Sequence, residues 1–295
     1  MIRNFIAAIF AGLSGLYLIS SAEAAEITVG PRKQWNSKRF AVEEFKPYRL
    51  TFKARVDGEM TFERNAEMLE AFYDVNRVHR GVNAPRWEKR FWTASGKKTG
   101  WNILFPYWTS VFSSALTEYV DVFYAPREAV ELEIVFINSD SKAVFYATEP
   151  VLKRENLSTV NVNPDFSLGR FCHAGYAMAG YGSSVQMLPK KEGGYFMRIA
   201  SWVNTDPMPV VAGRRYRVEI KLRPDTFSGA RCTVTFSDWA GKAVKNSGGL
   251  VLAKKATLGG TEVFRAPEGA SAVSLMLGAA DYESIRITEE KEGVK

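Results

Sequence analysis

The stretches YRLTFKAR at residues 48–55 and YRVEIKLR at residues 216–223 are two versions of one short sequence. In both, apolar and polar residues alternate, which is the period-two pattern of a strand with one buried face and one face in water. In the second stretch, every second residue from Tyr216 to Leu222 is apolar, and Arg or other charged residues occupy the positions between them. These two stretches predict a chain built mainly of antiparallel β-strands.

Other segments repeat in the same order, so the similarity extends beyond one strand. The segment VFYAPREAVELEIVF at 122–136 matches VFRAPEGASAVSLML at 263–277, with Ala-Pro at the same place, and the closing segments EPVLKRE and SIRITEE resemble each other. FSDWAGKAV at 236–244 has two candidate equivalents, which begin at Phe72 and at Phe91. We predict Phe72, because it leaves similar gaps of 17 and 13 residues after the two YR strands.

The repeat predicts two tandem antiparallel jelly-roll β-sandwich domains, since regularly spaced short strands with turns between them usually close in that way. The first unit then contains an enlarged, aromatic region at residues 80–117. The predicted boundaries of the chain are 1–25 for a signal peptide, 26–155 and 156–290 for the two sandwiches, and 291–295 for a charged tail.

The first residues have the order of a secretory signal. Arg3 precedes the apolar run FIAAIFAGLSGLYLI, and SSAEAAE follows with small residues suited to cleavage after Ala24 or Ala25. The apolar run is too short to favour a permanent membrane helix, which needs about 20 apolar residues, although a retained anchor is the alternative. We therefore expect a secreted or periplasmic protein without stable membrane insertion.

An exported chain meets oxidising conditions, in which its two cysteines, Cys172 and Cys232, can form a disulfide. A disulfide between them is one prediction, and two buried free thiols are the other. Two cysteines and two histidines provide no zinc-ligand spacing.

The repeated blocks resemble the jelly-roll carbohydrate-binding modules attached to bacterial xylanases and cellulases, within the galactose-binding-like sandwich superfamily. The second unit matches over nearly its whole length, through NPDFSLG, EGGYFMRIAS, VVAGRRYRVEIKLR, FRAPEGASAVSLML and YESIRI. The first unit matches from YRLTFKAR onward. The resemblance implies a non-catalytic protein that binds polysaccharide on exposed aromatic rings. A separate glycan-degrading enzyme is a candidate partner.

The same resemblance implies a structural calcium ion near the termini of a sandwich, held by an acid on the last strand. Asp281 or Glu283 stands there in the second unit, and Tyr146 and Thr148 stand there in the first. The first unit departs from the family's pattern at these two positions, since neither Tyr nor Thr carries a carboxylate.

The aromatic candidates are concentrated in the first unit. WNILFPYW at 101–108 alternates in such a way that Trp101 and Tyr107 share one strand face and Trp108 lies on the other, so some of these rings should face solvent. Upstream, RWEKRFWTASGKK at 86–98 mixes aromatic and basic residues, a chemistry that suits an acidic or sulfated glycan. Its candidate contacts are Trp87, Arg90 and Trp92. For 101–108, the alternative to a ligand-binding role is a thick hydrophobic core under a large loop. For 86–98, the alternative is a solvated hairpin.

The second unit offers fewer candidates. Tyr176 and Tyr181 occur in the Gly-rich segment HAGYAMAGYGSS, and Trp202 follows in IASWVN. Such a loop can hold a ligand, but glycines and small residues also pack closely.

Other functions are less favoured by the sequence. Export argues against nucleic acid, although the net charge is +7. No Gly-x-Ser-x-Gly, His-Glu-x-x-His or phosphate-loop motif occurs, and no pair of carboxylates has the context of a glycosidase. The leading hypothesis is a secreted, non-enzymatic protein that binds polysaccharide. A structural or adhesion module is the alternative, followed by a glycan-active hydrolase or lyase.

Overall fold

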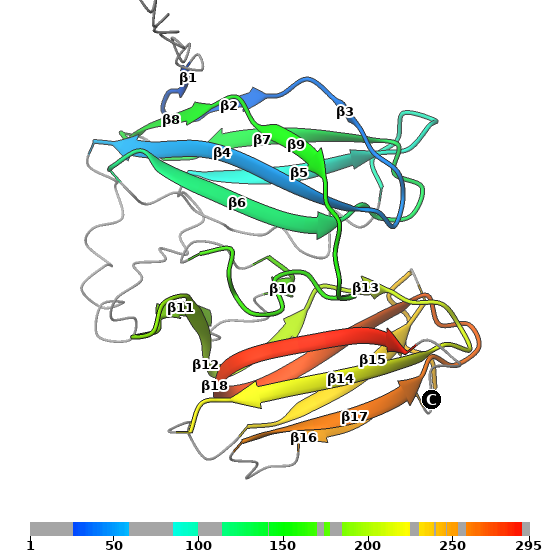
Figure 1. The fold of residues 1–295 in the computed structure, drawn as a ribbon. Helices are drawn as coiled ribbons and strands as arrows, with labels where there is room; N and C mark the ends of the chain where they lie inside the picture. The colour runs from blue at the N-terminus through cyan, green and yellow to red at the C-terminus, as the bar shows by residue number, and fades with distance from the viewer. Residues whose placement is uncertain are drawn as a thin grey trace, which may run out of the picture.

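The computed structural model describes residues 26–58, 85–99, 114–140, 142–169, 174–177, 185–224, 230–238, 240–245, 247–252 and 258–290. Every regular element in these ranges is a β-strand, and the strands form two layered bodies, one from each half of the chain (Figure 1). Among these residues no helix is long and apolar enough to cross a membrane. The predicted all-β fold of two tandem sandwiches is confirmed.

The first body consists of two antiparallel sheets that face each other. The five-stranded sheet has the order β1-β8-β4-β6, with β9 also paired to β4, and the four-stranded sheet has the order β2-β7-β3, with β5 also paired to β7. The strands are β1 (Glu26–Val29), β2 (Lys33–Asn36), β3 (Phe40–Ala41), β4 (Pro47–Asp57), β5 (Arg86–Trp92), β6 (Thr117–Tyr124), β7 (Glu131–Asn138), β8 (Val144–Thr148) and β9 (Val151–Arg154).

Aromatic side chains fill the space between these two sheets. Phe52 of β4 contacts Trp87 of β5 and Phe136 of β7, each with 5.0 Å between ring centroids. Tyr119 of β6 stacks on Phe52 at 5.6 Å. Edge-to-face and offset contacts of this kind stabilise a core beyond the burial of apolar area alone, by about 0.5–1.5 kcal/mol for each pair.

The second body is one nine-stranded antiparallel sheet that folds back on itself. Its path is β10-β12-β18-β14-β17, and the 19-residue β18 pairs with β12 and β15 through its first part and with β14 through its last part. The strands are β10 (Tyr176–Ala177), β11 (Val185–Pro189), β12 (Tyr195–Thr205), β13 (Met208–Pro209), β14 (Arg215–Leu222), β15 (Cys232–Ser237), β16 (Gly249–Leu252), β17 (Gly259–Arg265) and β18 (Ala272–Glu290).

Matching hydrogen bonds show that the two bodies are copies of one unit. The Tyr48 hydroxyl accepts a hydrogen bond from the Glu43 backbone N–H at 2.8 Å, and the Tyr216 hydroxyl accepts one from the Val211 N–H at the same distance. The YR strands also make equivalent pairs, because β4 lies between β9 and β6 as β14 lies between β18 and β17. The repeat predicted from the sequence is confirmed.

One detail of the predicted repeat is wrong. The N–H of Thr99 donates to the carbonyl of Phe91 at 2.9 Å, and the N–H of Val244 donates to the carbonyl of Phe236 at 2.9 Å. Phe91, and not Phe72, is therefore the equivalent of Phe236. Gap lengths predict the wrong match because the connection from β4 to β5 is much longer than the connection from β14 to β15. As a result, the region 80–117 contains β5, a strand of the core.

The two bodies meet through a small hydrophobic cluster. Val122, on the outer face of β6, packs with Val162 and Ala174 from the beginning of the second half. Beside them the Tyr124 hydroxyl donates a hydrogen bond to the Val160 carbonyl at 2.7 Å. The outer face of β6 is therefore partly covered by the segment that leads into the second body, close to the domain boundary that the sequence predicts at 155/156.

Candidate functional site

Trp87 does not serve as a binding platform. It is 3% exposed and contacts Phe52 and Tyr119 between the two sheets of the first body. In β5 the residues at every second position point inward, so Trp87 and Phe91 enter the core together. The prediction that Trp87 contacts a ligand is corrected by its burial.

Trp92 and Arg90 lie on the opposite face of β5, where charged side chains surround them. The Arg39 guanidinium lies 4.2 Å from the centroid of the Trp92 ring, and the Lys98 ammonium lies 5.4 Å from it. Arg90 pairs with Glu88 at 3.0 Å. These contacts hold the predicted basic and aromatic groups against one another, which leaves less of the indole for a sugar.

Four of the predicted sugar-contacting residues lie outside the described residues. They are Trp101, Tyr107, Trp108 and Tyr181, and their proposed contacts stay predictions. Tyr176 is described, and it is a core residue: its ring packs against Phe166 with 5.6 Å between centroids, and burial raises the pKa of its hydroxyl well above 10. Tyr176 therefore presents no free face to a ligand.

Among the predicted site residues that the structure describes, Trp202 is the one with an exposed side chain. Its side chain is 43% exposed on the outer face of β12, directly opposite Gly278 of β18. The pairing register shifts between Ile199 and Trp202, which marks a β-bulge, and bulges commonly redirect a side chain. An indole beside a residue without a side chain leaves one side of the ring uncrowded by its cross-strand neighbour.

Arg231 continues this row on the far side of Gly278. The Gly278 N–H donates a hydrogen bond to the Arg231 carbonyl at 2.7 Å, and Arg231 is exposed. Leu277 and Cys232, the next pair along the two strands, point into the core, so the alternation directs Arg231 outward. Neighbouring strands are about 4.8 Å apart, which places the Cα atoms of Trp202 and Arg231 roughly 10 Å from each other.

A second row lies beside the first. Asn204 is opposite Met276, Met276 is opposite Thr233, and Thr233 is opposite Leu250. Met276 is 38% exposed and Leu250 is 47% exposed. We call these two rows the Trp202 face. Its members are Trp202, Asn204, Arg231, Thr233, Leu250, Met276 and Gly278.

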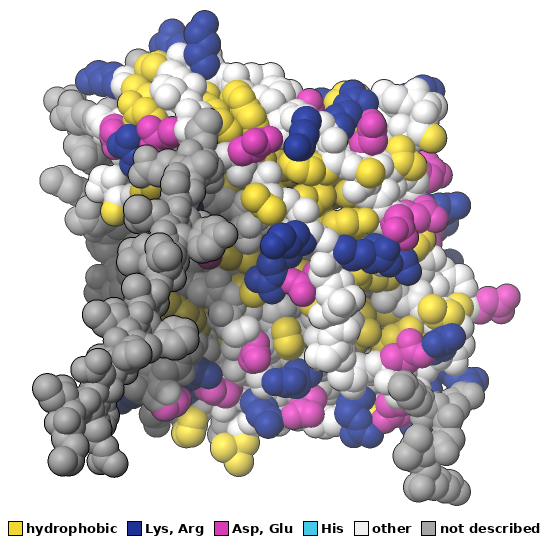
Figure 2. Space-filling model, turned by 45° about the horizontal axis from the view of Figure 1, so that its top comes forward, with side chains coloured by type: hydrophobic (Ala, Val, Ile, Leu, Met, Phe, Trp, Pro, Cys, Tyr) yellow, Lys and Arg dark blue, Asp and Glu magenta, His cyan; other side chains and the backbone are white. Residues whose placement is uncertain are grey.

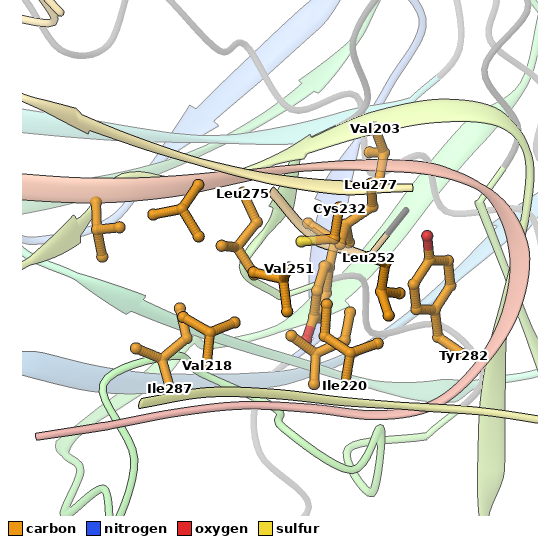
Figure 3. Packing of buried hydrophobic residues seen from close by; sticks show 14 of the residues in the cluster. Val203, Val218, Ile220, Cys232, Val251, Leu252, Leu275, Leu277, Tyr282 and Ile287 are labelled. Carbon is orange, nitrogen blue, oxygen red and sulfur yellow. The ribbon is translucent and has the colours of Figure 1, made fainter. Parts of the chain in front are cut away.

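The other side of the same strands is tightly packed. Val203, Leu277 and Cys232 lie side by side in the interior of the second body, directly behind the row of Trp202, Gly278 and Arg231 (Figure 3). β18 bends around this interior, and Tyr282 lies at the bend. The Trp202 face is therefore mounted on a rigid core rather than on a loop.

Cys232 is a free thiol in this core. Its side chain faces the packed interior, and burial raises the pKa of the thiol to about 12. The predicted disulfide with Cys172 is therefore not present in the structure, while Cys172 lies outside the described residues. The alternative of a buried free thiol holds for Cys232.

The acids considered for calcium are held by basic side chains. Asp281 accepts two hydrogen bonds at 2.8 Å from the Arg198 guanidinium, and Glu283 accepts one from Lys190 at 2.7 Å. Arg223 lies 3.4 Å from the other oxygen of Glu283. No group of three or more His, Cys, Asp or Glu side chains that could hold a metal occurs in the part of the chain that the structure describes. These two carboxylates are therefore paired with Arg and Lys side chains of the protein.

The net positive charge is not gathered in one place on the face shown in Figure 2. Basic and acidic side chains alternate over it, with hydrophobic side chains between them. Long-range attraction of an anionic ligand is weak on such a surface, because charges beyond about 8 Å are largely screened at physiological salt. Recognition of an anion on such a surface depends on individual cations.

Two solved structures resemble this chain distantly. No protein-family model matches the chain, and no curated protein matches it in sequence. The tandem CBM22-1-CBM22-2 domain of Xyn10C from Paenibacillus barcinonensis is similar to this chain at 8% identity and a TM-score of 0.32, covering 90% of this chain and 87% of that one. The PBSX exported protein XepA is similar at 10% identity and a TM-score of 0.22, covering 90% and 85%. Scores this low say nothing about a ligand.

Proposed function

We propose that this chain is a non-catalytic protein that binds polysaccharide, and that the Trp202 face contacts the sugar. The observation that carries the proposal is the partly exposed indole of Trp202. It lies opposite Gly278 on a sheet whose other face packs into the hydrophobic core. The C–H face of a pyranose packs well on an aromatic ring, and an aromatic side chain loses little conformational entropy on binding because it has only two rotatable χ angles.

A polar group beside the indole supplies the second requirement of sugar recognition. Asn204 lies two residues from Trp202 on the same face, whereas the hydroxyl oxygen of Thr233, across from Met276, is buried. An amide group donates and accepts hydrogen bonds, as sugar hydroxyls do. The arrangement of an apolar platform with a few polar groups is typical of small-ligand sites.

Export to the periplasm or the medium belongs to the same proposal, and so does cooperation with a separate glycan-degrading enzyme. A binding module without its own catalytic pair raises the local concentration of a partner enzyme on its polymer. The paired acids Asp281 and Glu283 agree with this role, because each is engaged by a cation instead of lying free at a cleft.

The test is affinity electrophoresis or calorimetry with a panel of soluble polysaccharides. Trp202→Ala should abolish retention, whereas Leu258→Ala, a change at another exposed apolar side chain that is 73% exposed, should not. Parallel variants Trp101→Ala and Trp108→Ala examine the first body. Loss of binding only in those two would move the site there, and no retained polymer for the unmodified protein would overturn the proposal.

A module that contacts another protein is the second candidate. It is favoured by Met276 and Leu250, two exposed apolar side chains on either side of Thr233. Met and aromatic residues are enriched in protein interfaces. A protein partner that competes with polysaccharide, or binds when no polysaccharide does, would favour this candidate.

A further inference from the structure

Arg231 differs from two other arginines of the second body, Arg198 and Arg223. Arg198 forms a two-pronged ion pair with Asp281, and Arg223 pairs with Glu283. The Arg231 guanidinium is exposed and forms no ion pair with any described residue. An exposed guanidinium without an ion pair among the described residues can meet an anion from outside the chain.

The position of Arg231 relative to Trp202 fits one acidic sugar. The two residues flank Gly278 in a single cross-strand row, and their Cα atoms are roughly 10 Å apart. Gly278 has no Cβ, so no side chain rises between the indole and the guanidinium. The long Arg side chain can therefore reach toward a ring that lies on Trp202.

The chemistry of the guanidinium selects the anion. Its planar N–H groups match the two oxygens of a carboxylate, and a charge-assisted bidentate pair is stronger and more directional than a hydrogen bond to a hydroxyl. A pyranose that carries a carboxylate at the ring edge presents an apolar C–H face and an anion in one residue. The apolar face of such a sugar suits the indole of Trp202, and its carboxylate suits the guanidinium of Arg231 in the same cross-strand row.

We propose that the Trp202 face recognises a uronic acid residue of an acidic polysaccharide, with the pyranose on Trp202 and its carboxylate on Arg231. This inference rests on the proposed function and specifies its ligand. Asn204 then lies on the side of Trp202 where it can meet ring hydroxyls, and the apolar row of Met276 and Leu250 borders the sugar. The affinity depends on one ionic contact, so it should fall moderately with salt.

The experiment compares a polyuronate, the same polymer after reduction of its carboxyl groups, and a sulfated glycan of similar length. For the unmodified protein, we expect binding to the polyuronate to exceed binding to the reduced polymer. Arg231→Gln should weaken binding to the polyuronate by about 10- to 100-fold, because a hydrogen-bonded charge pair is lost, and leave the reduced polymer unaffected. Arg231→Lys should restore part of the affinity.

A matched control removes another exposed arginine elsewhere. Arg127 lies in the first body with a long 3.9 Å contact to Glu128, and Arg127→Gln removes the same charge without touching the Trp202 face. It should bind the polyuronate as the unmodified protein does. Equal losses in the two Gln variants would show a general charge effect and overturn the inference.

The outcomes separate this inference from the proposed function. If Trp202→Ala abolishes binding of both polymers while Arg231→Gln binds the polyuronate normally, the uronic acid assignment is wrong and polysaccharide binding stands. Preference for the sulfated glycan over the polyuronate also overturns the assignment. If the unmodified protein retains none of the three polymers, both proposals fail.

Discussion

The hydroxyl of Tyr282 donates a hydrogen bond to the carbonyl oxygen of Gly278 at 2.8 Å. Tyr282 lies entirely within the core of the second body, whereas Gly278 lies between Trp202 and Arg231 on the Trp202 face. The same hydroxyl is 3.5 Å from the carbonyl oxygen of Arg231. A buried phenol thereby fixes the backbone beneath the surface that we propose to bind sugar.

Tyr282→Phe should lower the free energy of unfolding by about 1 kcal/mol, because a buried hydrogen bond is removed while the ring still fills its space. Urea denaturation measures the change. Tyr146→Phe is the control, since the Tyr146 hydroxyl forms no hydrogen bond with any described residue, and its stability should be unchanged. Equal stability of both variants would contradict a structural role for the Tyr282 bond.

The turn after Ala-Pro gives a prediction from the repeat. Gly269 has φ of 81°, and the equivalent residue of the first body, Glu128, has φ of 65°. Gly269→Ala should cost about 1 kcal/mol, because a Cβ is strained in this region and no atom within 4 Å compensates or clashes. Gly30→Ala, in equally open space without a positive φ, should cost nothing measurable.

Glu128→Gly is the reverse experiment. Removing the strained side chain offsets the greater flexibility that glycine gives the unfolded chain, so this variant should be as stable as the unmodified protein or more stable by up to about 1 kcal/mol. The backbone N–H that donates to Glu44 at 2.7 Å is retained. A loss of stability in Glu128→Gly would show that its side chain has a role beyond the turn.

An ion pair lies between the two sheets of the first body. Lys89 on β5 points inward and pairs with Asp121 on β6, with its ammonium 4.4 Å from the centroid of the Phe123 ring. Lys89→Met should cost about 3–5 kcal/mol, because Asp121 is left as an uncompensated charge. The double variant Lys89→Met with Asp121→Leu should recover most of that loss. Denaturant unfolding of these two variants and of Asp121→Leu alone completes the cycle, and additive losses would refute the coupling.

Stability should fall in alkaline solution. Burial raises the pKa of Cys232 from 9 to about 12. Above pH 9 the thiol loses its proton in the unfolded chain but keeps it in the folded chain, so the free energy of unfolding falls as the pH rises from 9 toward 12. At pH 10.5 the loss from this thiol is about 2 kcal/mol relative to pH 8. Burial also raises the pKa of Tyr282, which extends the decline. Cys232→Ala should show a shallower decline between these pH values.

Thiol labelling tests the state of Cys232 independently. In the folded protein without reductant, a thiol reagent at pH 8 should react slowly with Cys232, because the buried thiol is almost entirely protonated. After unfolding without reductant, both cysteines should react. Failure of both to react would show that Cys172 and Cys232 are paired by a disulfide.

The sequence was sufficient for the strands of the repeat but not for every match between the copies. Alternation over 48–55 and 216–223 identified β4 and β14, because one face of each strand is core and the other is wet. The equivalence of Phe91 and Phe236 was missed because insertions change the length of loops without changing the pairing of strands. Hydrogen-bond register, which spacing alone does not reveal, determines the match.

The site was harder to predict because composition does not give the direction of a side chain. The mixture of Trp and basic residues in β5 resembled a binding platform, yet one indole is in the core and the other lies under cations. Trp202 was predicted, but its partner Arg231 was not. Its signal was the position directly before the inward-facing Cys232, together with the glycine that interrupts the apolar run of β18.

The hydrogen bond between Tyr124 and Val160 has a consequence for the independence of the two copies. Together with the packing of Val122 against Val162, it gives each copy one side of a shared contact. Separating the chain at the junction would expose these apolar side chains to water, so either half expressed alone should be less soluble than the whole chain.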